Sequence, residues 1–192
     1  ADLLIYGMGE RPIIEIARRL QQGENIKQLD DIPQTASMQP LSNMPRVTED
    51  EGNIVLASHE ECLLHKRKQS ENFKHIEEES NKYHAKRLWQ SVGERAIMVN
   101  PPYPPMTEID ASFDLPYTRM PHPKYKGKTI PAYEMIKFSV NLHRGCFGGC
   151  AFCTISAHQG KFIASRSKES ILKEVKQIIN MPDFKGYLSD LG

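Results

Sequence analysis

The sequence predicts an α/β fold, because apolar segments of strand length are followed by segments with helical periodicity. Residues 3–6 are a short apolar segment, a glycine turn follows it, and apolar side chains then recur at helical spacing along 13–20. Near the other end, residues 136–142 alternate apolar and polar side chains, and a second helical pattern follows Ser167. Both regions have the strand–helix order that builds parallel sheets.

The bulk composition narrows the class of protein. The 192 residues contain 26% charged and 39% hydrophobic side chains, as is ordinary for a globular protein. Lys and Arg number 25 against 24 for Asp and Glu, so nucleic-acid binding is not indicated. No apolar run approaches the roughly 20 residues that span a bilayer, and residues 1–5 are too short and too acidic for a signal peptide. We therefore expect a cytoplasmic protein with no membrane partner.

The first part of the chain predicts a unit that needs further strands. We expect residues 1–30 to be the last strand–helix unit of an N-terminal α/β domain, because one strand and one helix cannot bury their own apolar surfaces. Pro12 suits the first turn of the helix and Gly23 its end. The polar residues 31–53 contain prolines at 33, 40 and 45, which favours a linker.

The middle of the chain, at about residues 54–99, predicts a strand followed by a long charged helix. We expect the strand at 53–57 and the helix from His59 to about Gln90, ended by Gly93, with a brief strand at 97–99. Cys62 lies in this helical pattern as an ordinary, partly buried side chain. Frequent prolines in residues 100–131 predict an extended, irregular connector.

Residues 132–192 predict a strand–helix–strand unit. Ser167 is a good N-cap for the helix, which closes at Asn180, and the second strand is expected at about 186–189. Three cysteines, Cys146, Cys150 and Cys153, lie in the loop after the first strand. Ligands bind at that carboxyl edge of parallel sheets.

The three cysteines fall within eight residues at the spacing C-x3-C-x2-C, which favours a metal centre over disulfides. Thiolates are the ligands of iron–sulfur clusters, and glycines at 145, 148 and 149 let the backbone curl around one. Three ligands would leave one iron open. Two weaker alternatives stay open: a structural zinc site completed by His143 or His158, and a redox pair of Cys150 with Cys153.

This motif resembles that of the radical S-adenosylmethionine (SAM) superfamily, because an aromatic residue, Phe152, precedes the last cysteine. The text around it is similar to the YgiQ-type proteins of bacteria, a radical SAM group without a settled reaction. That similarity is carried by residues 143–150, 158–160, 165–167 and 185–192 and by shorter matches at 121–123 and 130–137. The resemblance implies that residues 132–192 are the start of a partial (βα) barrel, preceded by a cobalamin-binding-like α/β domain.

The resemblance also implies cofactors and roles. Cys146, Cys150 and Cys153 would hold a [4Fe–4S] cluster, and Phe152 would lie near the adenine of SAM. Asp190, Leu191 and Gly192 would begin the segment that meets the methionine amine. An electron donor of flavodoxin or ferredoxin type would reduce the cluster, and SAM would be cleaved to a 5′-deoxyadenosyl radical that acts on an unknown substrate.

Two further expectations concern the extent and the class of the enzyme. Only 39 residues follow Cys153, whereas a barrel needs about 200, so we expect both ends of the sequence to be cut and the isolated chain to be inactive. Any histidine that ligates cobalamin would precede residue 1, so the sequence does not test cobalamin use. The alternatives are a radical SAM methylthiotransferase or methylase acting on RNA or protein, and a non-enzymatic zinc-stabilised interaction module.

Overall fold

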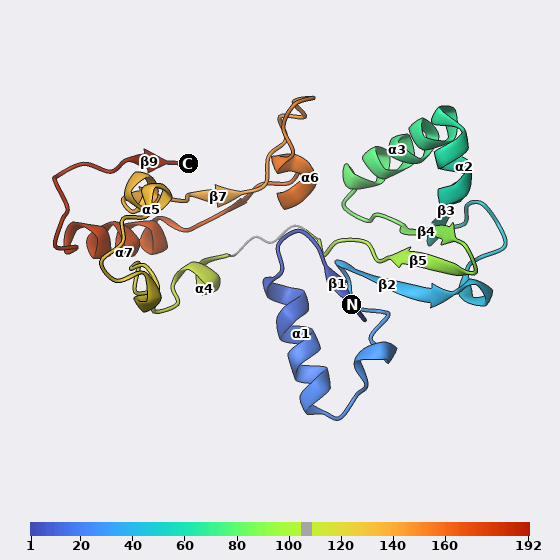
Figure 1. Ribbon diagram of the computed structural model, residues 1–192, viewed down its shortest axis with the longest axis horizontal. Coiled ribbons are helices and arrows are strands. Elements are labelled where there is room, and N and C mark those ends of the chain that lie inside the picture. The colour runs from blue at the N-terminus through green and yellow to red at the C-terminus, as the bar shows by residue number, and fades with distance from the viewer. Residues whose placement is uncertain (105–108) are drawn as a thin grey trace. The chain divides into compact units, whose positions relative to one another are not determined.

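The computed structural model describes residues 1–104 and 109–192. The chain divides into two compact units (Figure 1). The first unit comprises Ala1–Pro105 and Cys146–Phe162, and the second comprises Met106–Gly145 and Ile163–Gly192. Each unit is described by itself.

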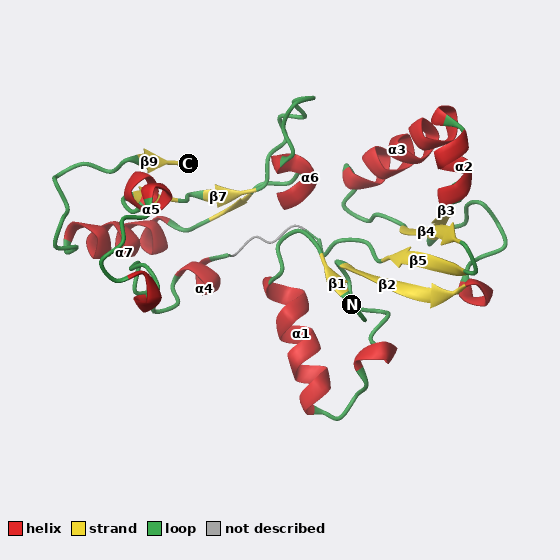
Figure 2. Ribbon diagram, viewed as in Figure 1, coloured by secondary structure: helices red, strands yellow, loops and turns green. Residues whose placement is uncertain are grey.

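The first unit is built on a five-stranded mixed sheet with the order β1-β2-β5-β4-β3 (Figure 2). Its strands are β1 (Leu4–Ile5), β2 (Thr35–Pro40), β3 (Asn53–Val55), β4 (Arg87–Val92) and β5 (Arg95–Val99). β3 and β4 run parallel and all other neighbours are antiparallel. The order places β5 at the centre, with both of its edges hydrogen bonded.

Helix α1 (Glu10–Gln21) follows β1, as expected from Pro12 and the apolar periodicity. Its buried Ile16 packs with Leu29 and Ile32, and Leu3 and Ile5 lie against this cluster. Arg19 near the end of the helix pairs with Glu24 and Asp31, and these ion pairs lower the pKa of both carboxyl groups. The loop after α1 is thus fixed to the helix.

The expected linker at 31–53 is wrong. Residues 35–40 form β2, which pairs along its length with β5 and through its first residues with β1. The strand–helix unit at 1–30 is therefore part of a sheet that this chain makes itself. Asn100, only 1% exposed, secures this arrangement because its amide donates to the carbonyls of Asp30 and Ile32 and to Thr35 Oγ1. The prolines misled the prediction, since Pro33 and Pro45 flank the strand and Pro40 ends it.

The expected single helix from 59 to 90 is also wrong. The chain forms α2 (His59–Leu64), bends at His65, and continues as α3 (Lys66–Ser80). Residues 87–92 are β4, and Gly93, with a φ of +55°, lies in the β4–β5 turn and does not end the helix. Trp89 of β4 is 5% exposed and packs with Ala96 and Met98, so burial between β3 and β5 outweighs helical propensity in this segment.

The second unit contains the predicted strand–helix–strand arrangement, with shifted strands. β6 (Ser139–Val140) and β9 (Asp190–Leu191) pair in parallel, and α7 (Lys168–Ile179) connects them in the chain. Ser167 caps α7 as predicted, because its hydroxyl accepts from the Ser170 amide. The second strand begins later than the predicted 186–189. The helix packs on the sheet through a buried cluster of Phe138, Val140 and Ile178.

Two shorter elements flank β6. Residues 131–136 form helix α5 (Pro131–Ile136), so the alternation at Ile136 did not belong to a strand. After β6, β7 (His143–Arg144) pairs antiparallel with β8 (Ala164–Ser165). The cysteine loop, defined here as residues 145–163, leaves from β7 and returns to β8, and it contains the short helix α6 (Ile155–Gln159).

The predicted proline-rich connector is mostly irregular where it is described. It contains α4 (Asp110–Phe113) and a 3-10 turn, Pro123–Tyr125. Its residues 105–108 lie outside the described part of the chain. Among the helices of residues 1–104 and 109–192, none is both long and apolar enough to cross a membrane.

Candidate functional site: the cysteine loop

The cysteine loop is closed by backbone contacts on both sides. The antiparallel pairs His143 with Ser165 and Arg144 with Ala164 hold its two ends together. Within the loop, the Cys146 amide donates to the Gly160 carbonyl at 3.0 Å. Gly145 and Gly160 both have φ near +91°, a conformation that glycine adopts at no steric cost. Cys146 is thus held where the loop narrows.

Gly148 lies between the sulfurs of the first two cysteines. A Cβ at this position would be 3.3 Å from Cys146 Sγ and 3.7 Å from Cys150 Sγ. The Gly148 amide also approaches Cys146 Sγ at 3.4 Å, as a donor to that sulfur. Amide donors of this kind stabilise a thiolate that ligates a metal. The absence of a side chain at 148 therefore lets two sulfurs approach one stretch of backbone.

The third cysteine is connected to the second through a tight turn. The Cys153 amide donates to the Cys150 carbonyl at 3.0 Å. Cys150 is exposed, whereas Cys146 and Cys153 are half-buried, and all three are free thiols. Gly149, between the first two cysteines, has a φ of +60°, a conformation that favours glycine.

A cluster fits these residues by donor chemistry and by the space left at Gly148. Three thiolates on one loop are the ligand set of an iron–sulfur centre with one open iron. Within the described ranges, no three His, Cys, Asp or Glu side chains are gathered closely enough to hold a single metal ion. This holds for the three cysteines alone as well as for the three cysteines taken with His143 or His158.

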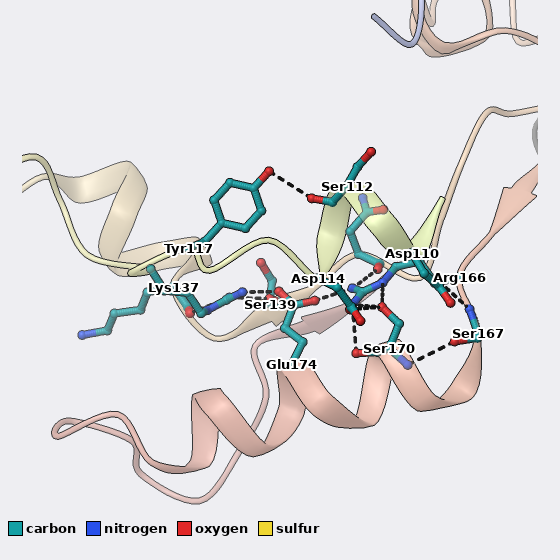
Figure 3. Close-up of polar contacts among 12 residues, drawn as sticks. Asp110, Ser112, Asp114, Tyr117, Lys137, Ser139, Arg166, Ser167, Ser170 and Glu174 are labelled. Atoms are coloured by element: carbon teal, nitrogen blue, oxygen red, sulfur yellow. Dashed lines mark hydrogen bonds and ion pairs between the residues drawn. The ribbon is translucent and has the colours of Figure 1, made fainter. Parts of the chain in front are cut away.

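The base of the cysteine loop is fixed in the second unit by Arg166 (Figure 3). Its amide donates to the Leu142 carbonyl and its guanidinium to the Asn141 carbonyl, both at 2.9 Å. The same guanidinium bonds the Ser170 hydroxyl and pairs with Glu174 on α7. Arg166 thereby connects the end of β6, the return of the loop and the first turns of α7.

The Arg166 guanidinium is also enclosed by the connector. Its Cζ lies 4.4 Å from the centroid of the Phe113 ring, and Arg144 approaches the same ring at 4.9 Å. Asp114 accepts a hydrogen bond from the Ser170 hydroxyl. This bond is the largest cause of the lowered pKa of Asp114, and the hydrogen bond from Lys173 is the second. Arg119 pairs with Glu174 and donates to the carbonyls of Lys137 and Ser139. The predicted irregular connector is therefore firmly attached to α7 and β6.

The residues predicted to contact SAM fall in both units. Phe152, in the first unit, is 91% exposed. Asp190 and Leu191 form β9 in the second unit, and Gly192 is paired to β6 and its continuation through Val140 and Leu142. Asp190 and Leu191 thus form the strand itself, and Gly192 follows its carboxyl end, which is the end predicted for ligands.

Some residues of the site had no recognisable signal in the sequence. Arg119 and Glu174 lie 55 residues apart, and only the fold brings them to Arg166. Arg166 itself was marked by the family similarity at 165–167 and by its place before the N-cap Ser167, and neither gave it a role. An arginine placed between a strand and a helix can donate to the carbonyls of a neighbouring strand, as Arg166 does to Asn141.

The chain was compared with known proteins. The family model described as Radical SAM N-terminal matches residues 1–139, so the three cysteines follow the matched region. Relatives named UPF0313 protein are 62% identical in Bacteroides thetaiotaomicron, 64% in Porphyromonas gingivalis and 43% in Methanocella arvoryzae. Each match covers 100% of this chain but only 33%, 30% and 31% of those relatives, so the chain spans about a third of their length. No solved structure matches. By the match over residues 1–139, the chain belongs to the Radical SAM N-terminal family.

Proposed function

We propose that this chain carries the cluster-binding loop of a radical SAM enzyme. The observation that carries the proposal is the approach of Cys146 and Cys150 to Gly148, with the Gly148 amide directed at a sulfur. Cys146, Cys150 and Cys153 would ligate three irons of a [4Fe–4S] cluster, and SAM would bind the fourth. When bound, the cluster supplies the electron that cleaves SAM to a 5′-deoxyadenosyl radical.

The residues around the loop support distinct parts of this role. The exposed side chains of Phe147, Cys150 and Phe152 leave the tip of the loop open to SAM and to a small electron donor of flavodoxin or ferredoxin type. In the second unit, Gly192 follows the carboxyl end of the parallel pair, where ligands bind in such sheets, and the resemblance assigns Asp190, Leu191 and Gly192 to the polar end of SAM. We also propose that a partial (βα) barrel completes the site. The proposal names no substrate.

Anaerobic reconstitution with ferrous iron and sulfide tests the proposal. We expect about four irons per chain, a broad visible absorption and a change of that spectrum when SAM is added. Replacing any one of Cys146, Cys150 and Cys153 by serine should abolish stable iron binding. Cys62→Ser is the matched control, because Cys62 lies on α2 and accepts from Asn72 at 3.0 Å. Stoichiometric zinc binding without iron uptake would instead identify a structural metal module.

A further inference from the structure

The returning half of the cysteine loop, residues 158–162, belongs to the first unit and contacts the N-terminal segment of that unit, residues 1–104, at several places. The first is an ion pair: Lys161 Nζ donates to Glu77 Oε2 on α3 at 2.5 Å, across 84 residues of sequence. The Lys161 side chain is only 15% exposed, so the pair is shielded from solvent on the loop side. A shielded pair is weakened less by salt than a fully exposed one.

The second contact is aromatic. Phe162 lies against Tyr83, which follows α3, with ring centroids 4.4 Å apart and an angle of 45° between the rings. Tilted pairs at this distance stabilise by more than the burial of their area alone. Lys161 and Phe162 are consecutive, so the loop returns to β8 over one surface formed by α3 and the residues after it.

The third contact involves the glycine turn between β1 and α1. A Cβ at Gly7 would lie 3.8 Å from the His158 carbonyl, which places this turn beside α6. The turn is held by Gln34, whose side-chain amide donates to the carbonyls of Tyr6 and Met8. Gly7 itself has a φ of +68°, so a substitution here would strain the backbone that faces the loop.

These contacts are linked to a predicted ligand. Gly160 precedes Lys161, and its carbonyl accepts the amide of Cys146 at 3.0 Å. Any displacement of 158–162 therefore acts on the backbone of Cys146. The first unit holds the side of the cysteine loop that positions one of the three thiolates.

We propose that residues 1–104 of the first unit are the platform that positions the cysteine loop for the cluster, with Glu77 and Tyr83 as positioning residues. The inference rests on the proposed function for the role of the cysteines. A loop that is already ordered loses less conformational entropy when it binds a ligand, so it holds the ligand more tightly. The N-terminal part of the chain then contributes to the site directly, because its side chains position the loop that contains the cysteines.

The docking is tested first without metal. Amide hydrogen–deuterium exchange of residues 158–163 should be about fivefold faster in Glu77→Gln than in the parent chain. It should be about tenfold faster in Tyr83→Ala. Glu78→Gln is the matched control, because Glu78 is the next residue on α3 and pairs with Lys74. Tyr83→Phe keeps the ring and should preserve protection. Exchange equal in all these variants would overturn the docking.

The positioning role is tested on the reconstituted chain. Release of iron to a chelator should be faster in Glu77→Gln and Tyr83→Ala, and the midpoint potential of the cluster should shift, with Glu78→Gln unchanged. The charge-exchanged variant Glu77→Lys with Lys161→Glu should restore retention. Faster exchange with unaltered iron release and potential would overturn the positioning role. A parent chain that binds no iron would overturn the proposed function instead. The hydrogen–deuterium exchange experiment, made without metal, would still show whether residues 158–163 are docked.

Discussion

Glu174 forms an ion pair with Arg166, whose side chain is completely buried, and a second one with Arg119. The carboxylate is itself 15% exposed and is flanked by both guanidinium groups. Two cations from different segments thus converge on one acid of α7. A buried charge whose partner is removed keeps its desolvation cost without compensation, so this acid has a large effect on stability.

Glu174→Gln should therefore lower the free energy of unfolding by about 3 kcal/mol. Urea unfolding followed by circular dichroism measures this loss. Glu169→Gln is the matched control, since Glu169 is exposed on the first turn of the same helix, and it should change stability far less. Equal losses in the two variants would show that the Arg166 charge is satisfied without Glu174.

Gly148→Ala should weaken iron binding, because the new Cβ would lie 3.3 Å from Cys146 Sγ, closer than ordinary contact. We expect iron to be lost about tenfold faster to a chelator, as for other changes beside metal ligands. Gly52→Ala serves as the control, since an added Cβ there would meet only Asp50 at 3.9 Å. Unchanged retention in Gly148→Ala would mean that the two sulfurs do not bind their metal across residue 148.

Asn100→Ala should destabilise the sheet of the first unit by about 2 kcal/mol or more. The substitution removes the amide donor of two buried acceptors, the Ile32 carbonyl and Thr35 Oγ1, and of the part-buried Asp30 carbonyl. It also leaves Arg87 Nε without the Asn100 Oδ1 that it bonds at 2.8 Å. Thermal and urea unfolding measure the effect. Asn43→Ala is the comparison, because Asn43 is exposed and its amide bonds Gln39 at 3.3 Å. Similar losses of unfolding free energy in Asn100→Ala and Asn43→Ala would contradict the expectation that the buried amide stabilises the sheet more than the exposed one.

The capping box of α2 predicts a pH dependence. The backbone amide of Ser58 and then its hydroxyl lower the pKa of Glu61 below its ordinary value of 4.5. Because the folded-state pKa is the lower one, the stabilisation is fully present above about pH 4.5 and is lost as the pH falls through the folded value.

The difference in free energy of unfolding between the parent chain and Glu61→Gln should therefore shrink on acidification below that pH. Ser58→Ala should reduce this pH dependence, because it removes the second of the two donors. A difference that stays constant from neutral to acidic pH would contradict the ionised capping box.

Local signals in the sequence located the two helices whose boundaries are set by neighbouring residues. Pro12 lies in the first turn of α1, Ser167 caps α7, and apolar side chains repeat along both, so their bounds follow from interactions a few residues long. The motif of Cys146, Cys150 and Cys153 was equally local. Its glycines indicated a curled loop, and the structure has Gly149 in a left-handed conformation.

The strands β2 and β4 were missed because strand formation depends on distant partners. Residues 35–40 look like a linker until β5, some sixty residues later, pairs with them. Trp89 lies in a segment that continues the helical pattern of α3, and only burial against Met98 shows why it is a strand. A periodicity read over a short window contains no information about such partners.

The sequence by itself therefore determined the α/β class, α1, α7 and the cysteine motif, all of which depend on patterns within one turn, one helix or one loop. Tertiary structure alone decided which sheet the first strand joins and which acid neutralises Arg166. It also decided that Glu77 of α3 contacts Lys161 and that Tyr83 contacts Phe162. The physical reason is that a packing contact between residues 80 apart depends on the whole chain path, which local propensity does not specify.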